Sequence, residues 1–442
     1  MQPRSISLLQ SLLLSSLLCA AASAAAPPAP LRLFDDAPRP GVEVLAVAPD
    51  TTHTLEGESV SADAALRTAS PGSAIELART RRADGGAALA LQWRKIWKSG
   101  VALQTKPQDL RPFLAHGTLA FDLKVDALAA GGLVVKVGCG PDCERQLPYV
   151  LPGRAAEGKG WQRVVLAMSC FARDGDDFSQ VARPFTLEGT GSGHVSIANV
   201  VISPTGTPNT ACPDWRTVAV TPAKLDEAWS IDWWLPRHRQ KLQDAKRMVA
   251  EGLSPQLVFI GDSITQGWEK EGASVWQTHY ARHDALGLGF GGDRTENVLW
   301  RLQHGAVDGL DPKVAVLMIG TNNTGLRGDL PANTLAGIRR NLDELQQRLP
   351  RTRILLVAIF PRDATPDGPL RRINDAINAG LPALADGKRI VFLDLNRAFL
   401  APDGTLSKDI MPDLLHPNEA GYVIWARAMQ PELDRLMALP RL

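Results

Sequence analysis

The sequence predicts an α/β domain in the C-terminal half of the chain, preceded by an all-β domain. From Leu257 onward, short apolar runs alternate with helical patterns, which is typical of a parallel sheet covered by helices on both faces. Before about residue 205, alternating or apolar runs are separated by Gly, Asp and Pro clusters, and few helical patterns interrupt them. The 442 residues suffice for two domains, and an apolar share of 45% supplies ample core material.

The first 26 residues are typical of a secretory signal peptide. Arg4 supplies a positive charge, residues 6–18 are largely apolar but too few to span a membrane, and residues 20–26 are all alanine or serine. Cys19 would suit a lipoprotein signal, but Leu18 is a poor fit to the small residue that such a site prefers. We therefore expect export, to the periplasm or the cell exterior. No later run of 18 apolar residues occurs, so we expect no transmembrane segment.

Charge and cysteine content limit the classes of partner. The formal net charge of +1 does not indicate binding to nucleic acid or to an anionic membrane surface. After Cys19, an even number of cysteines remains, which suggests disulfides in an exported protein: Cys139, Cys143, Cys170 and Cys212. The first two could close a small loop. A zinc site is the alternative, but no histidine lies between Cys139 and Cys170 to complete a ligand pattern.

The first domain is expected to be a two-sheet sandwich or jelly roll, because its strands need to bury one face each. The expected strands are residues 89–94, 117–125, 133–137, 164–166 and 195–202. A linker is expected over residues 206–220, because the stretch Ser203-Pro-Thr-Gly-Thr-Pro-Asn-Thr consists of turn-forming residues.

Residues 226–250 are expected to form a helix that carries Trp229, Trp233 and Trp234. Such a cluster is either a ligand platform or, more often, the surface by which a helix packs on a domain core. We expect the packing role.

The α/β domain is expected to contain five buried strands, at residues 257–260, 285–290, 314–319, 354–360 and 390–393. Apolar residues at helical spacing follow Pro331 and recur over residues 370–384, and a last helix is expected from Pro417. Ligands of such sheets bind beyond the carboxyl ends of the strands. The loops at those ends are residues 261–265, 291–295, 320–325 and 396–416.

These loops carry the parts needed for acyl transfer. Ser263 lies where strand gives way to helix, so its hydroxyl can be exposed as a nucleophile; the alternative is a simple helix cap. His416 would deprotonate Ser263, and Asp413 would hold the imidazole in the required tautomer. The backbone N–H groups of Ser263 and Gly292 and the side-chain amide of Asn322 would bind the oxyanion. Each feature alone is commonly structural, but together they fall in order on strand ends of one sheet.

A dinucleotide site is the competing interpretation of Gly287-Leu-Gly-Phe-Gly-Gly292, which satisfies G-x-G-x-x-G after a strand. Such a site also needs an acidic residue at the end of the next strand, which here is followed by Gly320-Thr-Asn. Asp308 and Asp311 have the required distance but precede that strand. We therefore expect no cofactor and no metal.

Residues 257–422 resemble the SGNH (GDSL-type) hydrolases, in the branch similar to platelet-activating-factor acetylhydrolase catalytic subunits. The motifs that carry the resemblance are Gly261-Asp-Ser-Ile-Thr, Phe290-Gly-Gly-Asp-Arg-Thr-Glu-Asn-Val-Leu-Trp-Arg-Leu302, Gly320-Thr-Asn-Asn323 and Asp413-Leu-Leu-His-Pro-Asn-Glu-Ala-Gly-Tyr422. The resemblance implies a flavodoxin-like parallel sheet and assigns the nucleophile to Ser263, the acid and base to Asp413 and His416, and the oxyanion donors to Gly292 and Asn322. Gly287 and Asn323 depart from the pattern of many relatives, although the acetylhydrolase branch shares the asparagine.

The first domain resembles the galactose-binding-like β-sandwich modules of bacterial polysaccharide-degrading enzymes. The resembling segments are residues 138–143, 161–171 and 197–202. This resemblance implies a carbohydrate-binding module.

We therefore expect a signal peptide at residues 1–26, a β-sandwich at 27–205, the linker at 206–220 and a hydrolase domain at 221–442. The expected function is a secreted serine esterase that removes O-acetyl groups from an oligo- or polysaccharide. A lysophospholipase or general short-chain esterase is the enzymatic alternative. A non-catalytic carbohydrate-binding protein with a silent hydrolase domain is the alternative of a different class.

Overall fold

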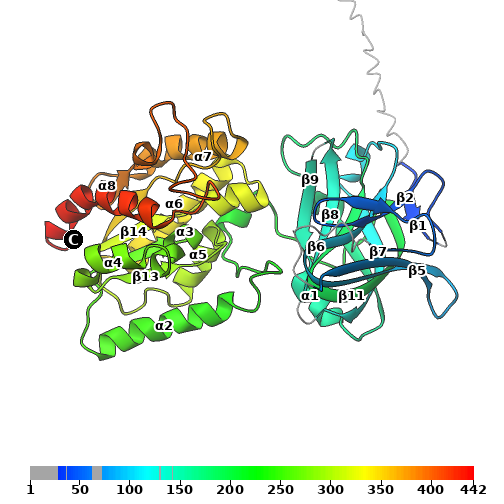
Figure 1. Ribbon diagram of the computed structural model, residues 1–442, viewed down its shortest axis with the longest axis horizontal. Helices are drawn as coiled ribbons and strands as arrows, with labels where there is room; N and C mark the ends of the chain where they lie inside the picture. The colour runs from blue at the N-terminus through cyan, green and yellow to red at the C-terminus, as the bar shows by residue number, and fades with distance from the viewer. Residues whose placement is uncertain (1–27, 36, 62–71, 129–130, 142) are drawn as a thin grey trace, which may run out of the picture.

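The computed structural model describes residues 28–442 except residues 36, 62–71, 129–130 and 142. The expected signal peptide lies outside the described residues. The chain forms a β domain and an α/β domain that lie side by side (Figure 1). No helix in the described part of the chain has the length and apolar character needed to cross a bilayer.

The β domain is a single curled sheet of eleven strands whose pairs are all antiparallel. The strands are β1 (Leu31–Phe34), β2 (Glu43–Val47), β3 (Thr52–Thr54), β4 (Ser59–Ser61), β5 (Ala74–Arg81), β6 (Ala87–Gln104), β7 (Thr118–Ala127), β8 (Gly132–Gly140), β9 (Cys143–Pro148), β10 (Trp161–Ala167) and β11 (Phe185–Ser203). One short helix, α1 (Val150–Ala156), and the 3-10 turns η2 (Arg111–Phe113) and η3 (Met168–Cys170) accompany them. The expected all-β character is confirmed.

The two longest strands join the other strands into one continuous sheet. β6 and β11 pair along most of their length, with register shifts between Gly189 and Gly193 that bend the pair. A Cβ added at Gly189 or Gly193 would lie 2.6 or 2.3 Å from the ring of Trp93, which is buried. Glycine is therefore needed there, because the backbone bends tightly around the indole. The sandwich or jelly-roll arrangement stays a prediction.

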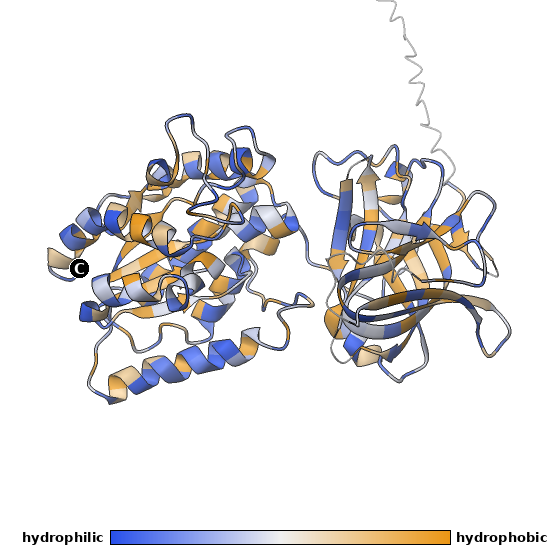
Figure 2. Cartoon of the chain, in the orientation of Figure 1, coloured by the Kyte–Doolittle hydropathy of each residue, from blue (hydrophilic) through white to orange (hydrophobic). Residues whose placement is uncertain are grey.

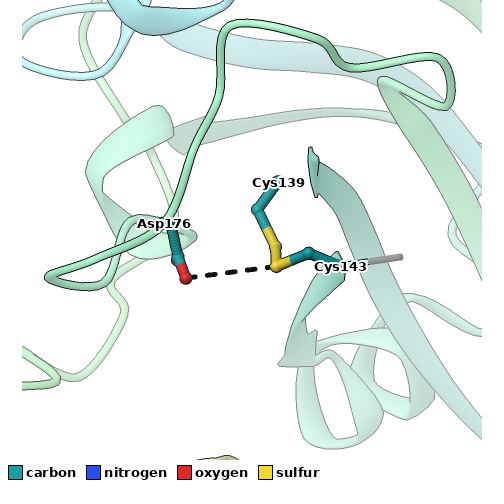
Figure 3. Close-up of side chains that lie close together, drawn as sticks. All are labelled: Cys139, Cys143 and Asp176. Carbon is teal, nitrogen blue, oxygen red and sulfur yellow. Dashed lines mark hydrogen bonds between the residues drawn. A yellow bond between two sulfur atoms is a disulfide. The ribbon is translucent and has the colours of Figure 1, made fainter. Parts of the chain in front are cut away.

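Two disulfides confirm the expectation from the cysteine count: Cys139–Cys143 and Cys170–Cys212. Asp176 lies beside the first of them, with Oδ1 4.0 Å from the Cys143 sulfur (Figure 3). These three residues are the one cluster with metal-ligand geometry in the described part of the chain. Because both sulfurs are joined in a disulfide, neither is a thiolate ligand, and Asp176 instead pairs with Arg145 at 2.9 Å.

The α/β domain is built on a five-stranded parallel sheet in the order β13-β12-β14-β15-β16. All five expected strands form, as β12 (Leu257–Gly261), β13 (Leu286–Gly289), β14 (Val314–Met318), β15 (Arg353–Val357) and β16 (Ile390–Leu393). The helices are α2 (Trp234–Ala250), α3 (Ser263–Gln266), α4 (Ala273–His279), α5 (Thr295–Gln303), α6 (Pro331–Arg348), α7 (Pro369–Gly380) and α8 (Glu419–Ala438). The short 3-10 turns are η4 (Val218–Val220), η5 (Gly267–Glu269), η6 (Ala281–His283), η8 (Leu381–Leu384) and η9 (Asn396–Phe399), and η7 (Asn323–Arg327) is a π-helical turn.

Helices cover both faces of this sheet, as expected. Along β12, Leu257 and Phe259 join an apolar cluster with α4 and α8, whereas Val258 and Ile260 join a cluster with α2, α5, α6 and α7. The side chains alternate because successive residues of a strand point to opposite faces. The sheet is accordingly the apolar centre of the domain in Figure 2.

The helix expected over residues 226–250 begins later, at Trp234. The Ser230 hydroxyl donates to the carbonyls of Leu225 (3.3 Å) and Glu227 (3.0 Å), so local side-chain bonds replace helical ones before this point. Residues 225–233 therefore form a turn-rich segment, here called the strap. The helix expected from Pro417 likewise begins at Glu419, with Asn418 as its cap.

The β domain contacts the α/β domain at the strap and at the turn after η7. Arg154 donates to Asp232 of the strap at 2.7 and 3.1 Å. A Cβ added at Gly132 would lie 2.1 Å from the Ala228 Cβ, and one added at Gly328 would lie 3.0 Å from Arg145.

Candidate active site

The turn between β12 and α3 places Ser263 at the carboxyl end of β12. A Cβ at Gly261 would lie 2.4 Å from the Met318 carbonyl oxygen, so only glycine fits at the end of this strand. Asp262 caps α3 by accepting from the Ile264 N–H at 3.0 Å. Burial raises the pKa of Asp262 to about 7, although that hydrogen bond and the nearby His416 act in the opposite direction.

Ser263, His416 and Asp413 form a continuous hydrogen-bonded chain. The Ser263 hydroxyl lies 2.8 Å from His416 Nε2, and His416 Nδ1 lies 2.6 Å from Asp413 Oδ2. The backbone N–H groups of His416 and Leu415 donate to Asp413 Oδ1 at 2.7 and 3.1 Å. This turn is tight enough to hold Leu414 at a φ of 59°, a left-handed conformation that costs free energy for a leucine.

The charge of Asp413 fixes the tautomer of the imidazole. Burial raises the pKa of Asp413, but the hydrogen bonds from the His416 ring and backbone outweigh it and hold the pKa below its usual range. The ionised carboxylate only accepts hydrogen bonds, so His416 Nδ1 is the donor and Nε2 faces the Ser263 hydroxyl.

The predicted oxyanion donors lie on loops that are tied to one another. Gly291 N–H donates to the side chain of Gln266 on α3 at 2.7 Å. Asn322 Nδ2 donates to the Asp293 carbonyl at 3.0 Å, which leaves the second hydrogen of its amide for another acceptor. Gly292 has a φ of +76°, and a Cβ there would lie 2.0 Å from the Trp229 ring. Their role in binding an oxyanion remains a prediction.

A buried ion pair supports the loop that carries Gly292. Asp293 accepts from Arg301 Nε at 2.8 Å and from the Trp234 indole at 2.6 Å, and the Arg301 guanidinium also reaches the Gly261 carbonyl at 3.3 Å. Burial raises the pKa of Asp293 to about 6, against the attraction of Arg301. Because this network joins the ends of β12 and β13, removing one partner would leave a buried charge unpaired and the loop unsupported.

Sequence reasoning missed this network. Asp293 and Arg301 stand two helical turns apart in the second motif, but nothing in the sequence indicates that the indole of Trp234 completes the site. Trp234 does have the expected packing role, since it is buried against Phe290 and Trp300.

Asn323, noted as a departure from many relatives, joins the third loop to α5. Its side-chain oxygen accepts from the Thr295 N–H at 3.0 Å, and its amide donates to the Thr295 hydroxyl and to Asp329, each at 3.0 Å. It is fully buried, so it supports the site without reaching the substrate pocket.

A pocket of about 560 Å³ opens at Ser263, within the size range of small-molecule sites. Its lining comprises Trp233, Ser263, Gln266, Gly267, Lys270, Glu271, Gly291, His416, Pro417 and Tyr422. Trp233 packs against the apolar cluster of Leu225, Trp234 and Phe290, as expected, and it also forms a wall of this pocket.

One glycine of the dinucleotide-like motif, Gly289, is explained by packing at the same place. A Cβ at Gly289 would lie 2.1 Å from the backbone nitrogen of Gln266, so glycine lets α3 lie directly on β13. The α3 helix carries Ser263 at its first position. Gly289 therefore contributes to the placement of the serine.

Comparison with known proteins supports both halves of the chain. A family model described as GDSL-like Lipase/Acylhydrolase family matches residues 259–424, and one described as Galactose-binding domain-like matches residues 58–202. Platelet-activating factor acetylhydrolase IB subunit alpha1 of Homo sapiens is 33% identical over 221 residues, which are 50% of this chain and 91% of that protein. The alpha2 subunit of Rattus norvegicus is 30% identical over 225 residues, with coverage of 50% and 91%. Both expected resemblances are confirmed.

Two solved structures are also similar to parts of the chain. The extra C-terminal domain of an exo-1,3/1,4-beta-glucanase from a Pseudoalteromonas species has 14% identity and a TM-score of 0.33, covering 41% of this chain and 96% of that one. An acetylxylan esterase from Geobacillus stearothermophilus has 22% identity and a TM-score of 0.34, covering 42% and 96%.

Proposed function

Because this chain belongs to the GDSL-like lipase/acylhydrolase family, we propose that it is a serine esterase whose nucleophile is Ser263. The observation that carries the proposal is the hydrogen-bonded chain from the serine hydroxyl through His416 to Asp413, at 2.8 and 2.6 Å. Nucleophile, base and orienting carboxylate are thus in contact in the order that acyl transfer requires.

In the first half of the reaction, Ser263 Oγ attacks the ester carbonyl carbon while His416 Nε2 takes its proton. The carbonyl oxygen becomes an oxyanion, which the N–H groups of Ser263 and Gly292 and the free amide hydrogen of Asn322 stabilise. The ester C–O bond then breaks, His416 returns the proton to the leaving alcohol, and the acyl group stays on Ser263. Water repeats the sequence in the second half and releases the carboxylic acid.

The proposed substrate is an acetyl ester on a carbohydrate. The match of residues 58–202 to a galactose-binding-like family supports a carbohydrate partner, and the pocket has polar side chains suited to hydroxyl groups, including Gln266, Lys270 and Glu271. The β domain is proposed as a carbohydrate-binding module over residues 27–205, linked through 206–220 to the catalytic domain at 221–442. Two disulfides support export to an oxidising compartment, the periplasm or the cell exterior.

A phospholipid acetyl ester is the second candidate, since the curated relatives are named platelet-activating factor acetylhydrolase subunits. An acetate-release screen separates the two. Purified protein is incubated with acetylated xylan, pectin and xyloglucan and with vesicles that contain an acetylated ether phospholipid, and free acetate is measured. Acetate from a carbohydrate alone supports the first candidate, and acetate from the vesicles alone supports the second.

The nucleophile is tested with Ser263→Ala, with Ser254→Ala as the matched control at an exposed serine. Ser263→Ala should lower kcat on 4-nitrophenyl acetate by several orders of magnitude and abolish labelling by a fluorophosphonate, whereas the control should keep both. An active Ser263→Ala protein would overturn the assignment. Wild-type protein that binds saccharide but releases no acetate and takes no label would indicate a non-catalytic binding protein.

A further inference from the structure

We propose that the paired rings of Trp229 and Trp233 form a stacking platform for a sugar ring of the substrate at the mouth of the active site. This inference rests on the proposed carbohydrate esterase function and assigns the substrate class to named residues. The two indoles are stacked, with their centroids 6.2 Å apart and an interplanar angle of 29°, so they form a single aromatic unit.

The platform lies directly beside the reacting groups. Trp233 lines the pocket together with Ser263 and His416. The Trp229 ring lies so close to Gly292 that a Cβ there would be 2.0 Å from it, and the Trp233 ring would be 3.5 Å from a Cβ at Gly291. A group stacked on either ring is therefore next to the loop whose N–H is proposed to bind the oxyanion.

Solvent reaches the platform in the absence of substrate. Trp229 is 48% exposed, although a tryptophan placed only for packing would be covered, as Trp234 is at 1%. A large exposed aromatic surface beside a catalytic pocket is a feature of binding sites.

The strap holds the two rings in place before substrate arrives. The Trp233 indole N–H donates to the Trp229 carbonyl at 2.8 Å. Arg294 donates two hydrogen bonds of 3.0 Å to Glu227, and both side chains are almost fully buried. Trp234 anchors the end of the strap to Asp293. Preorganisation of this kind reduces the entropy lost on binding.

The chemistry of the surroundings fits a sugar better than an alkyl chain. A pyranose ring has an apolar C–H face, which suits an indole, and hydroxyl groups at its edge, which need polar partners. Gln266, Lys270 and Glu271 supply such partners in the same pocket. A long acyl chain would instead require an enclosed apolar lining.

The test compares Trp229→Ala and Trp233→Ala with wild type on acetylated xylo-oligosaccharides, on 4-nitrophenyl acetate and on 4-nitrophenyl butyrate. We expect kcat/KM on the saccharide to fall about tenfold more than on 4-nitrophenyl acetate, with most of that extra loss in KM. Trp229→Phe should recover most of the loss because it keeps an aromatic face. Val249→Ala is the control, since it removes an exposed apolar side chain at the far end of α2.

Three results would overturn the platform. Equal losses on the saccharide and on 4-nitrophenyl acetate would mean that the rings only shape the catalytic loop. A selective loss on the butyrate would make them an acyl-chain wall. No loss on any substrate would make them spectators. Failure of the proposed function looks different, because the wild-type protein itself would then release no acetate from any carbohydrate.

Discussion

Replacing Asp262 with asparagine should stabilise the α/β domain relative to wild type, by an amount that grows as the pH rises. Asp262 is 1% exposed, and burial raises its pKa from 3.8 to about 7 in the folded protein. A carboxyl group with a raised folded-state pKa stabilises the fold fully below its unfolded pKa, and this stabilisation is lost as the pH rises through the folded pKa. Wild-type protein should therefore lose stability at this site between about pH 4 and pH 7.

The size of this loss follows from the two pKa values. A difference of one pH unit corresponds to 1.36 kcal/mol, so the interval from 3.8 to about 7 corresponds to about 4 kcal/mol. Asparagine does not titrate, but its side-chain oxygen can still accept the hydrogen bond from Ile264 that caps α3. The Asp262→Asn protein should therefore gain stability relative to wild type as the pH rises, by up to about 4 kcal/mol.

The contribution of another buried group, His238, to the free energy of unfolding has the opposite pH dependence. Burial lowers the pKa of His238 from 6.5 to about 4, so its contribution to stability is complete above pH 6.5 and is lost as the pH falls toward 4. Because His238 is present in both proteins, subtracting one stability curve from the other isolates the effect of Asp262.

Hydrogen exchange in increasing urea measures this difference, with peptides from β12 and β14 reporting on the α/β domain separately from the β domain. Free energies of opening are compared at pH 5, 6, 7 and 8 after correction for intrinsic exchange rates. Parallel stability curves for the two proteins would refute the reasoning, because they would show that Asp262 does not change its proton occupancy on unfolding in this range.

Two further predictions concern catalysis. Asn322→Ala should lower kcat by about 10²–10³-fold with little change in KM, because it removes a transition-state donor; a change confined to KM would contradict this role. Asp413→Asn should lower kcat by about 10⁴-fold, whereas Asp409→Asn, at a neighbouring exposed carboxylate, should not.

The parallel sheet and the order of the site loops could be predicted because both leave local signals. The five strands are largely buried apolar runs, and runs of this kind are readily recognised in a sequence. The serine, histidine and carboxylate then follow at strand ends, where the topology of such a sheet brings them together. The hydrogen-bonded chain from Ser263 to Asp413 agrees with the placement expected from that reasoning.

The β domain shows why other features could not be predicted. The expected strands at residues 89–94 and 195–202 are parts of β6 and β11, which extend over Ala87–Gln104 and Phe185–Ser203. The stretch around Gly189 and Gly193 has the composition of a loop, but its glycines form bulges around Trp93, a residue distant in sequence. Local propensity cannot report on such a contact.

The predicted start of the helix at residue 226 was wrong for a similar reason. The tryptophans of the strap continue the apolar pattern of α2, so the sequence predicts a longer helix with three packing residues. Only tertiary structure separates Trp234, which binds Asp293 in the core, from Trp233, which lines the pocket. The ring of Trp229 lies against Gly292 and is about half exposed. The turn at Ser230 makes that separation possible, because the residues before Trp234 lie outside the helix. The three rings therefore do not follow helical spacing.

The anchors of the strap also bear on what the β domain contributes. Its ion pair from Arg154 ends on Asp232, whose side chain is 70% exposed, and pairs of this kind contribute at most about 1 kcal/mol. The bonds from Arg294 to Glu227 and from Trp234 to Asp293 are buried and lie within the α/β domain, so they dominate the position of the strap. We infer that the aromatic platform belongs to the catalytic domain, and that the β domain acts by holding polymer nearby rather than by completing the active site.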